Sequence, residues 1–492
     1  MSEGHTHPSE EKAIHPWLKS LRVAFVPGQM SPLLEEVADG LLRHFQLLGH
    51  DTQATPDDST DLFLTTAPFG EPIPWRKALI FNLRKRFGTR GAPSIETLVH
   101  VTPDRFRALL DHFEQALAKE GPDPDDYEFP GLARKAPRVL YNLGRRGGAI
   151  VALERLVQAQ AMSLRVLLVV GDGRPSEAYH FDLVGAHPKS EADDLEAFYR
   201  DIVLRIVTTE STVDVKEHEL VGDRVAREVW EGLSTPTEMI SAARQLGKRN
   251  FFTDMVRISD VVQVPAVPES IANQYSEGCF ATWDPRLHAL IATVTGSARP
   301  VHKGGIGEDD LAVIVGVRPD GGGAQVRHVE GKRNDPPSTE AVEMIDIDSA
   351  LPTITLDDDS VENGALPVIR SKLHGHRGIS AYDPSHVEFV ELEPAYYHYL
   401  VSCATEAQAR GIKEAFARSE SLTDPGDARQ VAFTVLPGHG VFMVEKWVSG
   451  TAPFQTLWEY MDAGYLKVVN RVPQGPMRYV PGPSGQSILD TS

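Results

Sequence analysis

Short apolar runs and amphipathic stretches alternate through the first half of the chain. The run LRVAFVPGQ, which begins at Leu21, ends in proline and glycine, as a strand does before a turn. In the next stretch, SPLLEEVADGLLRHFQLLGH, Ser31 can cap a helix, Pro32 suits the first helical position and Gly49 can end the helix. Apolar residues recur between them at helical spacing, so the pattern predicts a strand followed by a helix.

The same alternation continues as far as residue 268. Strand-like runs (DLFLTTAP, ALIFNL, LRVLLVVGDG) are interspersed with helical patterns such as TPDRFRALLDHFEQALAKEG, SEADDLEAFYRDIVLRIVTTES and PTEMISAARQLGKR. A connection rich in Pro, Gly, Arg and Lys runs from Gly121 to Gly148. We therefore predict two doubly wound α/β domains, at residues 21–148 and 149–268, after a flexible tail at residues 1–20.

From residue 269 to residue 492 the pattern changes to strand-like runs broken by Gly and Pro. VRPDGGGAQVRHVE is typical of a hairpin, because the Asp-Gly-Gly-Gly stretch supplies residues that tolerate positive φ. Few helical patterns interrupt these runs. The sequence predicts a β-rich C-terminal domain, a barrel or a sandwich, and three domains agree with a prior of about 150 residues per domain.

Composition limits the cellular setting. With 41% hydrophobic and 24% charged residues, the chain has no apolar run near the ~20 residues of a membrane span. The N-terminal stretch MSEGHTHPSEEKAIHPW lacks the apolar core of a signal peptide, and we expect its histidines to be solvated. Two cysteines, Cys279 and Cys403, cannot form a disulfide framework, so a reducing cytoplasm is expected.

The net charge of −20 disfavours binding to nucleic acid, whose phosphates the surface would repel. One basic stretch, WRKALIFNLRKRFGTR from Trp75 to Arg90, departs from this balance. Its arginines and lysines flank an apolar run, so a solvated strand border is favoured, and an anion-binding rim is the alternative.

Gly171-Asp172-Gly173 follows a strand-like run and raises the possibility of a nucleotide-binding loop. The further glycine of a dinucleotide fingerprint is missing and Pro175 follows, so a plain turn after the strand is favoured. A nucleotide-dependent enzyme is kept as an alternative.

Carboxylates and imidazoles gather beside turns in the second half of the chain, where binding sites are usually built. A divalent metal needs two to four such groups converging from different strands. The candidates are Asp254, Glu277, His302 with Asp309 and Asp310, His374, His376 and His439.

Each of the histidines allows two interpretations. His439 lies between two glycines, either as a ligand reaching into a pocket or at the tip of a hairpin. His302 is a ligand near Asp310, or else the two aspartates simply solvate a turn. His374 and His376 would share a face of an extended segment, but a solvent-exposed loop rich in Arg and Lys is the favoured interpretation.

The order of these elements resembles that of the L-arabinose and L-fucose isomerase group, which interconverts aldoses and ketoses with a metal. The resemblance spans about residues 254–442, and no motif in the N-terminal domains matches. It rests on four stretches: Phe252-Thr-Asp254, Glu277-Gly-Cys279, His302-Lys-Gly-Gly-Ile-Gly-Glu-Asp309 and Gly438-His439-Gly-Val-Phe442.

The resemblance implies a metal-dependent isomerase acting on a sugar or a sugar-like polyol. Asp254 and Glu277 would then be the acid/base residues, and Glu277, His302 and His439 would hold a divalent metal, Mn²⁺ above all. Cys279 is one of only two cysteines and has no obvious Cys/His pairing, so it is interpreted as a small buried neighbour of Glu277. The resemblance also implies a three-domain layout and a homo-oligomer, and the substrate's identity stays open.

The main alternative is a protein of another class on the same domains. A non-catalytic sugar- or metabolite-binding protein, or an assembly subunit, would have no turnover and would tolerate amide substitutions at Asp254 and Glu277.

Overall fold

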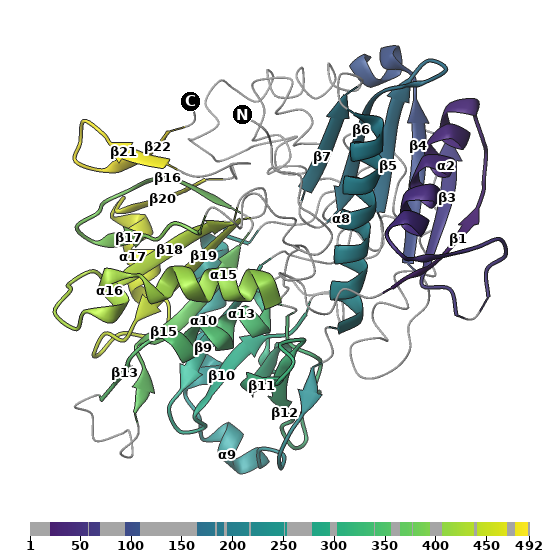
Figure 1. Cartoon of the computed structure of the whole chain (residues 1–492). Coiled ribbons are helices and arrows are strands. Elements are labelled where there is room, and N and C mark those ends of the chain that lie inside the picture. Colours follow the sequence, from purple (N-terminus) through teal and green to yellow (C-terminus); the bar gives the residue numbers. More distant parts are fainter. Residues whose placement is uncertain are drawn as a thin grey trace. The chain divides into compact units, whose positions relative to one another are not determined.

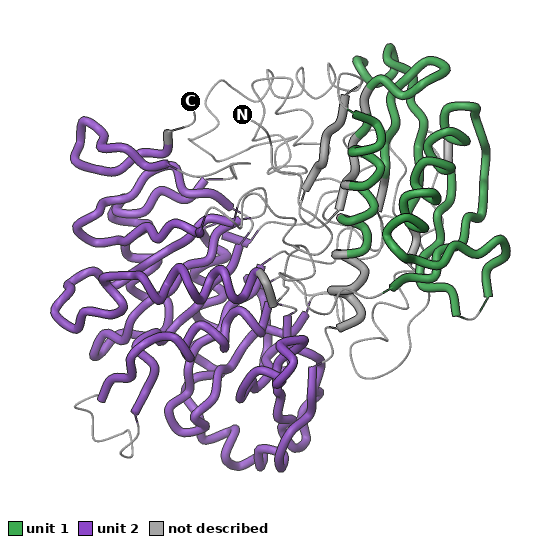
Figure 2. Tube along the Cα trace, viewed as in Figure 1, with its two compact units in different colours: residues 1–215, 255–273 green, residues 216–254, 274–492 purple. Residues whose placement is uncertain are grey.

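The computed structural model places two compact units, coloured separately in Figure 2. Unit 1 comprises residues 1–215 and 255–273, and unit 2 comprises residues 216–254 and 274–492. The residues that the structure describes are 20–57, 59–68, 94–108, 165–182, 185–190, 194–215, 218–249, 251–252, 278–295, 303–338, 340–355, 365–375, 377–393, 406–436, 440–469 and 478–490.

A seven-stranded sheet forms the centre of unit 1, in the order β2-β1-β3-β4-β5-β6-β7 (Figure 1). The neighbours from β2 to β5 pair in parallel, and β6 and β7 continue the sheet antiparallel. The strands are β1 (Arg22–Val26), β2 (Asp51–Gln53), β3 (Leu62–Pro68), β4 (Ser94–Val101), β5 (Arg165–Gly171), β6 (Pro175–Asp182) and β7 (Gly185–Ser190).

Among the described residues, the helices α2 (Pro32–Leu47) and α8 (Leu195–Val215) pack on this sheet. The predicted helix start is confirmed: Ser31 accepts a hydrogen bond from the Leu34 N–H, and proline occupies the first turn. Gly49, just beyond the helix, has φ +85°, a conformation that glycine adopts without strain. Apolar residues of both helices and of β1, β3, β4 and β5 form the core of this unit.

The fold is a mixed α/β arrangement, as the sequence predicts, but its sheets differ from the expectation. β4 pairs with β5, so strands from both predicted α/β segments join one sheet in place of two. The alternation of strands and helices along the sequence cannot show this, because it does not determine which strands become neighbours in a sheet. The predicted limits at residues 148 and 268 lie outside the described residues and stay predictions.

Unit 2 is built on a nine-stranded sheet in the order β17-β18-β19-β15-β9-β10-β11-β12-β8. Its centre is antiparallel, from β18 across to β12, and the edge strands β17 and β8 pair in parallel. The strands are β8 (Glu219–Leu220), β9 (Cys279–Asp284), β10 (Ala289–Thr293), β11 (Leu311–Val317), β12 (Ala324–Arg327), β15 (Ile369–Gly375), β17 (Val387–Phe389), β18 (Val431–Leu436) and β19 (Gly440–Lys446).

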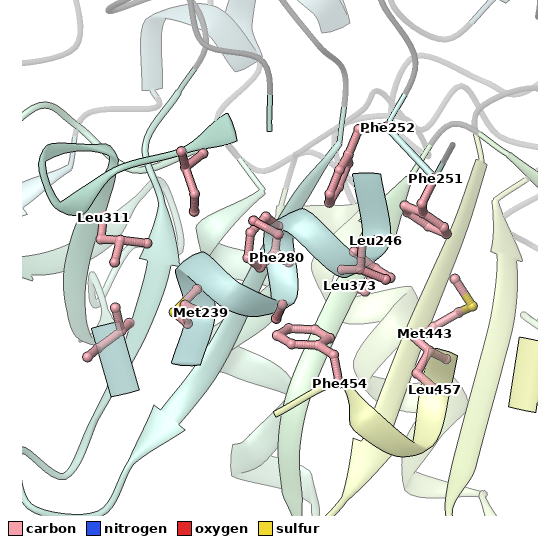
Figure 3. Close-up of a cluster of buried hydrophobic side chains, with 14 of the residues drawn as sticks. Met239, Leu246, Phe251, Phe252, Phe280, Leu311, Leu373, Met443, Phe454 and Leu457 are labelled. Carbon is pink, nitrogen blue, oxygen red and sulfur yellow. The ribbon is translucent and has the colours of Figure 1, made fainter. Parts of the chain in front are cut away.

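Successive strand residues point to opposite sides of this sheet, so both of its faces carry apolar side chains. Helices cover both faces. On one face α10 (Thr235–Lys248) and α17 (Gln455–Asp462) pack against strand residues such as Phe280 and Leu373, as Figure 3 shows. On the other face α13 (Ala341–Asp346) and α15 (Glu406–Ala417) enclose a second apolar cluster.

Smaller elements complete unit 2. The predicted hairpin is confirmed, since β11 and β12 pair antiparallel on either side of the glycine-rich stretch. No helix in the described part of the chain is long and apolar enough to cross a membrane. The remaining elements are α9 (Arg227–Glu231), α16 (Glu420–Thr423), the 3-10 turns η1 (Lys303–Gly305), η2 (Glu308–Asp310) and η3 (Ile347–Ala350), a pair β13 (Thr353–Ile354) and β14 (Leu366–Pro367), and a four-stranded sheet of β20 (Leu466–Val469), β16 (Gly378–Tyr382), β22 (Ser487–Asp490) and β21 (Arg478–Pro481).

Candidate functional site

The four residues that the sequence singles out for catalysis and metal binding lie outside the described residues. These are Asp254, Glu277, His302 and His439, and His376 and Cys403 lie outside them too. Their roles therefore stay predictions.

Their described neighbours along the chain nevertheless gather at one end of the nine-stranded sheet. Cys279, the first residue of β9, pairs with His374 near the end of β15, and Gly375 pairs with Val441 at the start of β19. Lys303 joins this end through a hydrogen bond from its ammonium to the Val294 carbonyl, at 2.5 Å, just after β10. Antiparallel register thus brings segments that are far apart in sequence to one end of the strands, the edge at which these strands begin or end.

A carboxylate with two donors lies at this edge. The Ser338 hydroxyl donates to Oε2 of Glu340, and the Cys279 thiol donates to the same oxygen at 3.6 Å. Cys279 is 1% exposed, which confirms that it is a small buried residue, whereas Glu340 is only partly buried. We call Cys279, Lys303, Ser338, Glu340 and His374 the edge cluster.

His374 is fully buried on β15, so the expected exposed loop is wrong for this residue. Its Nδ1 lies 3.0 Å from the Val441 carbonyl oxygen. A carbonyl only accepts, so Nδ1 carries the proton of the neutral ring and Nε2 carries the lone pair. A backbone bond of this kind fixes the tautomer and the ring plane of histidines that act as bases or as metal ligands.

Burial determines the charge states within the edge cluster. Burial lowers the pKa of His374, although the Glu340 charge and the hydrogen bond to Val441 act in the opposite direction. The lowered pKa keeps the imidazole neutral. Burial also raises the pKa of the Cys279 thiol, and the nearby Glu340 carboxylate adds to this rise. The thiol therefore stays protonated and acts as a donor and not as a nucleophile.

Asp309 and Asp310 have structural roles in the turn that precedes β11. Asp310 accepts the Gly307 N–H at 2.8 Å, and Asp309 accepts the Arg333 N–H at 3.2 Å. Asp310 is 7% exposed and held within the turn. The interpretation that the two aspartates serve a turn thus accounts for their described contacts.

The described residues contain no group of three or more His, Cys, Asp or Glu side chains arranged to hold a metal ion. His374 is one possible ligand at the sheet edge. A complete metal site would need the candidates Glu277, His302 and His439.

The Gly171-Asp172-Gly173 motif of unit 1 is a hairpin turn. β5 ends at Gly171 and runs antiparallel into β6, and Gly173 has φ +80°. A phosphate loop of the dinucleotide type leads from a strand into a helix, whereas this turn leads into another strand. The favoured interpretation as a plain turn is confirmed, and this motif gives the nucleotide alternative no support.

Ser338, Glu340 and Lys303 were not identified from the sequence. A weak signal for the first two exists in Pro-Pro-Ser-Thr-Glu, a hydroxyl and a carboxylate at a helix start. Lys303 directly follows the candidate His302, but lysine in a glycine-rich turn is usually solvated. The partner of Glu340 is 61 residues away in sequence, so the cluster emerges only from the sheet register.

No family model matches the chain, and no curated protein matches it. Among solved structures, a chain described as L-fuculose 1-phosphate aldolase aligns with 44% of this chain and 76% of its own length, at 14% identity and a TM-score of 0.24. A match at this level carries no argument about function.

These comparisons contradict the resemblance to the L-arabinose and L-fucose isomerase group. No isomerase family model matches the chain, and no curated isomerase does. The physical reason is that the motifs are short and centred on glycines. Glycine recurs wherever a tight turn joins two strands, so a turn with one His or Glu is weak family evidence.

Proposed function

We propose that unit 2 is the catalytic part of an enzyme that moves a proton at a carbon next to a carbonyl group. The observation that supports this is the edge cluster, in which the partly buried Glu340 carboxylate lies near a buried imidazole of fixed tautomer. Proton abstraction next to a carbonyl needs a positioned base and a group that stabilises the developing oxyanion. Carboxylate, neutral imidazole and ammonium groups are suited to these tasks.

In this proposal each residue has a stated part. Glu340 takes the proton from the carbon and returns it. The Nε2 atom of His374 is its metal-binding atom in this proposal, since the Nδ1 proton is held by the Val441 carbonyl. The buried Lys303 ammonium contributes positive charge near the developing oxyanion.

The substrate class in this proposal is a sugar or a sugar-like polyol. Aldose–ketose isomerisation is the reaction of this class expected from the sequence, and it stays the proposed reaction. The edge cluster supports the proton transfer that this reaction needs. The enediol-like state of this reaction also arises when a carbon–carbon bond next to the carbonyl breaks, so the test below covers both.

A divalent metal, Mn²⁺ above all, stays part of the proposal. When bound, such an ion polarises the carbonyl and so makes the adjacent proton more acidic. Glu277, His302 and His439 are the proposed ligands on sequence grounds, and His374 is the described imidazole that fits beside them. A homo-oligomer in a reducing cytoplasm, with no nucleic-acid partner, completes the proposal.

The test is exchange of the carbon-bound proton in D₂O, followed by NMR over a panel of aldoses, ketoses and their phosphates. Exchange reports proton abstraction whether the reaction ends in isomerisation or in cleavage. Glu340→Gln keeps the size of the side chain but removes the base, and we expect exchange to fall at least about 100-fold. Asp309→Asn is the matched control, because its amide oxygen can still accept the Arg333 N–H.

The outcomes separate the alternatives. Exchange that survives Glu340→Gln would exclude Glu340 as the base. Binding of a panel member without any exchange would support the non-catalytic binding protein instead. For the metal, Mn²⁺ should raise the Tm of the purified chain, and His439→Ala should weaken that effect. No bound divalent ion and no Mn²⁺ shift would remove the metal from the proposal.

A further inference from the structure

Ser338 is fixed by its backbone at the end of β10. Its N–H donates to the Thr293 carbonyl at 3.1 Å, and the Thr295 N–H donates to the Pro336 carbonyl at 2.9 Å. Between these two bonds Val294 and Pro337 form an antiparallel bridge. The segment that carries Ser338 therefore continues the sheet by one short step, and Ser338 itself is 9% exposed.

The Ser338 hydroxyl contacts the side chain of Glu340, the N-cap residue of α13, and not a backbone N–H of the helix. It donates to Oε2 of Glu340, while the contact of Ser338 with α13 runs through its carbonyl, which accepts the Ala341 N–H at 3.1 Å. In the described structure no side chain caps α13. A simple capping role would direct the hydroxyl to a backbone N–H, so its position calls for another explanation.

Two donors from different elements converge on one carboxylate oxygen. Cys279, at the start of β9, adds its thiol at 3.6 Å to the hydroxyl of Ser338. Rotating the carboxylate would break both contacts. A donor to the ionised carboxylate also disfavours its protonation.

We infer that Ser338 is a positioning residue, which holds the Glu340 carboxylate in one orientation and in its ionised form for proton abstraction. This inference rests on the proposed function. Ser338 acts through Glu340 and does not need to touch the substrate, because a base works only within hydrogen-bond reach of the proton and in its ionised form.

The first experiment compares Ser338→Ala, Ser338→Thr and Ser349→Ala in the exchange assay. Ser338→Ala should lower kcat with little change in KM, and should move the acid limb of the pH profile to higher pH, because the carboxylate loses a donor. Ser338→Thr keeps the hydroxyl, so its kcat and its pH profile should lie close to those of the unmodified chain. Ser349 is the control, since it is an exposed serine of η3, beyond the end of α13, that also contacts a carboxylate, that of Asp346, at 3.2 Å. Ser349→Ala should leave kcat and the pH profile unchanged.

The second experiment needs no activity and tests the contact itself. Urea unfolding of Ser338→Ala, Glu340→Ala and the double variant forms a cycle. We expect Ser338→Ala to lower the unfolding midpoint of the unmodified chain but to change it little when Glu340 is already alanine. Additive effects, or an unchanged pH profile in an active Ser338→Ala variant, would overturn the inference. No exchange in the unmodified chain, with the cycle still non-additive, would count against the proposed function instead.

Discussion

Glu445 is a carboxyl group in an apolar interior. It lies on β19 with 1% of its surface exposed, and its Oε2 accepts the Leu457 N–H at the start of α17, at 3.2 Å. Its Oε1 has no hydrogen-bond partner among the residues that the structure describes. Burial raises the pKa of Glu445 to about 8, and the Leu457 bond and the charge of Arg370 only partly oppose this rise.

The raised pKa makes stability depend on pH. The unfolded chain releases this proton near the ordinary value of 4.5, whereas the folded chain keeps it until about pH 8. Between these values the folded state binds more protons, so the free energy of unfolding falls as the pH rises. Glu445→Gln cannot ionise and can still accept the Leu457 N–H. It should be more stable than the unmodified chain at pH 8.5, by on the order of a few kcal/mol, with a flatter pH dependence.

Urea unfolding at steps from pH 5 to pH 9 measures this difference. Glu459→Gln is the control, because Glu459 is an exposed carboxylate on α17, the helix whose Leu457 N–H Glu445 accepts. Parallel stability curves for Glu445→Gln and the unmodified chain would show that Glu445 is ionised in the folded state.

At the scale of elements, close approach of two helices depends on one glycine. A Cβ added at Gly40 of α2 would come within 2.5 Å of the ring of Tyr199 on α8, a side chain that is 3% exposed. Alanine favours a helix interior over glycine by about 1 kcal/mol, but overpacking a buried contact typically destabilises by about 1–3 kcal/mol. The packing term should win in a site this well enclosed.

We therefore expect Gly40→Ala to lower the free energy of unfolding, as measured in urea. Asp39→Ala, one residue earlier on the exposed face of α2, is the control and should not destabilise. In a Tyr199→Leu background the ring is gone, and Gly40→Ala should then become neutral or stabilising. A stabilising effect of Gly40→Ala in the unmodified chain would mean that the two helices adjust without loss.

Elements with local signals could be predicted from the sequence, and the candidate site could not. Ser31, Pro32 and Gly49 mark the ends of α2 because capping acts within one helical turn. In KLHGHRG the polar residues favoured an exposed loop, yet Lys372 and His374 are both fully buried on β15. Each finds its partner far along the chain, Asp348 for Lys372 and the Val441 carbonyl for His374. The register that brings such partners together is a property of the whole sheet.

At the scale of the molecule, the chain divides its apolar residues among separate cores. One core belongs to unit 1 and includes Leu41 of α2, which is fully buried. Two others line the faces of the nine-stranded sheet in unit 2, and fully buried Leu373 of β15 belongs to one of them. A core of its own is what lets a part of a chain unfold cooperatively by itself.

We expect calorimetry to resolve two unfolding transitions, one for each unit. Leu41→Ala should lower only the unit 1 transition and Leu373→Ala only the unit 2 transition, because each removes buried methyl groups at about 2–5 kcal/mol from a different core. Mn²⁺, if it binds at the proposed site, should raise the same transition that Leu373→Ala lowers, since a ligand stabilises only the part that forms its site. A single transition that both variants lower equally would mean that the units unfold together. The metal site would then be located by comparing the Mn²⁺-dependent rise in Tm of the unmodified chain with that of His439→Ala.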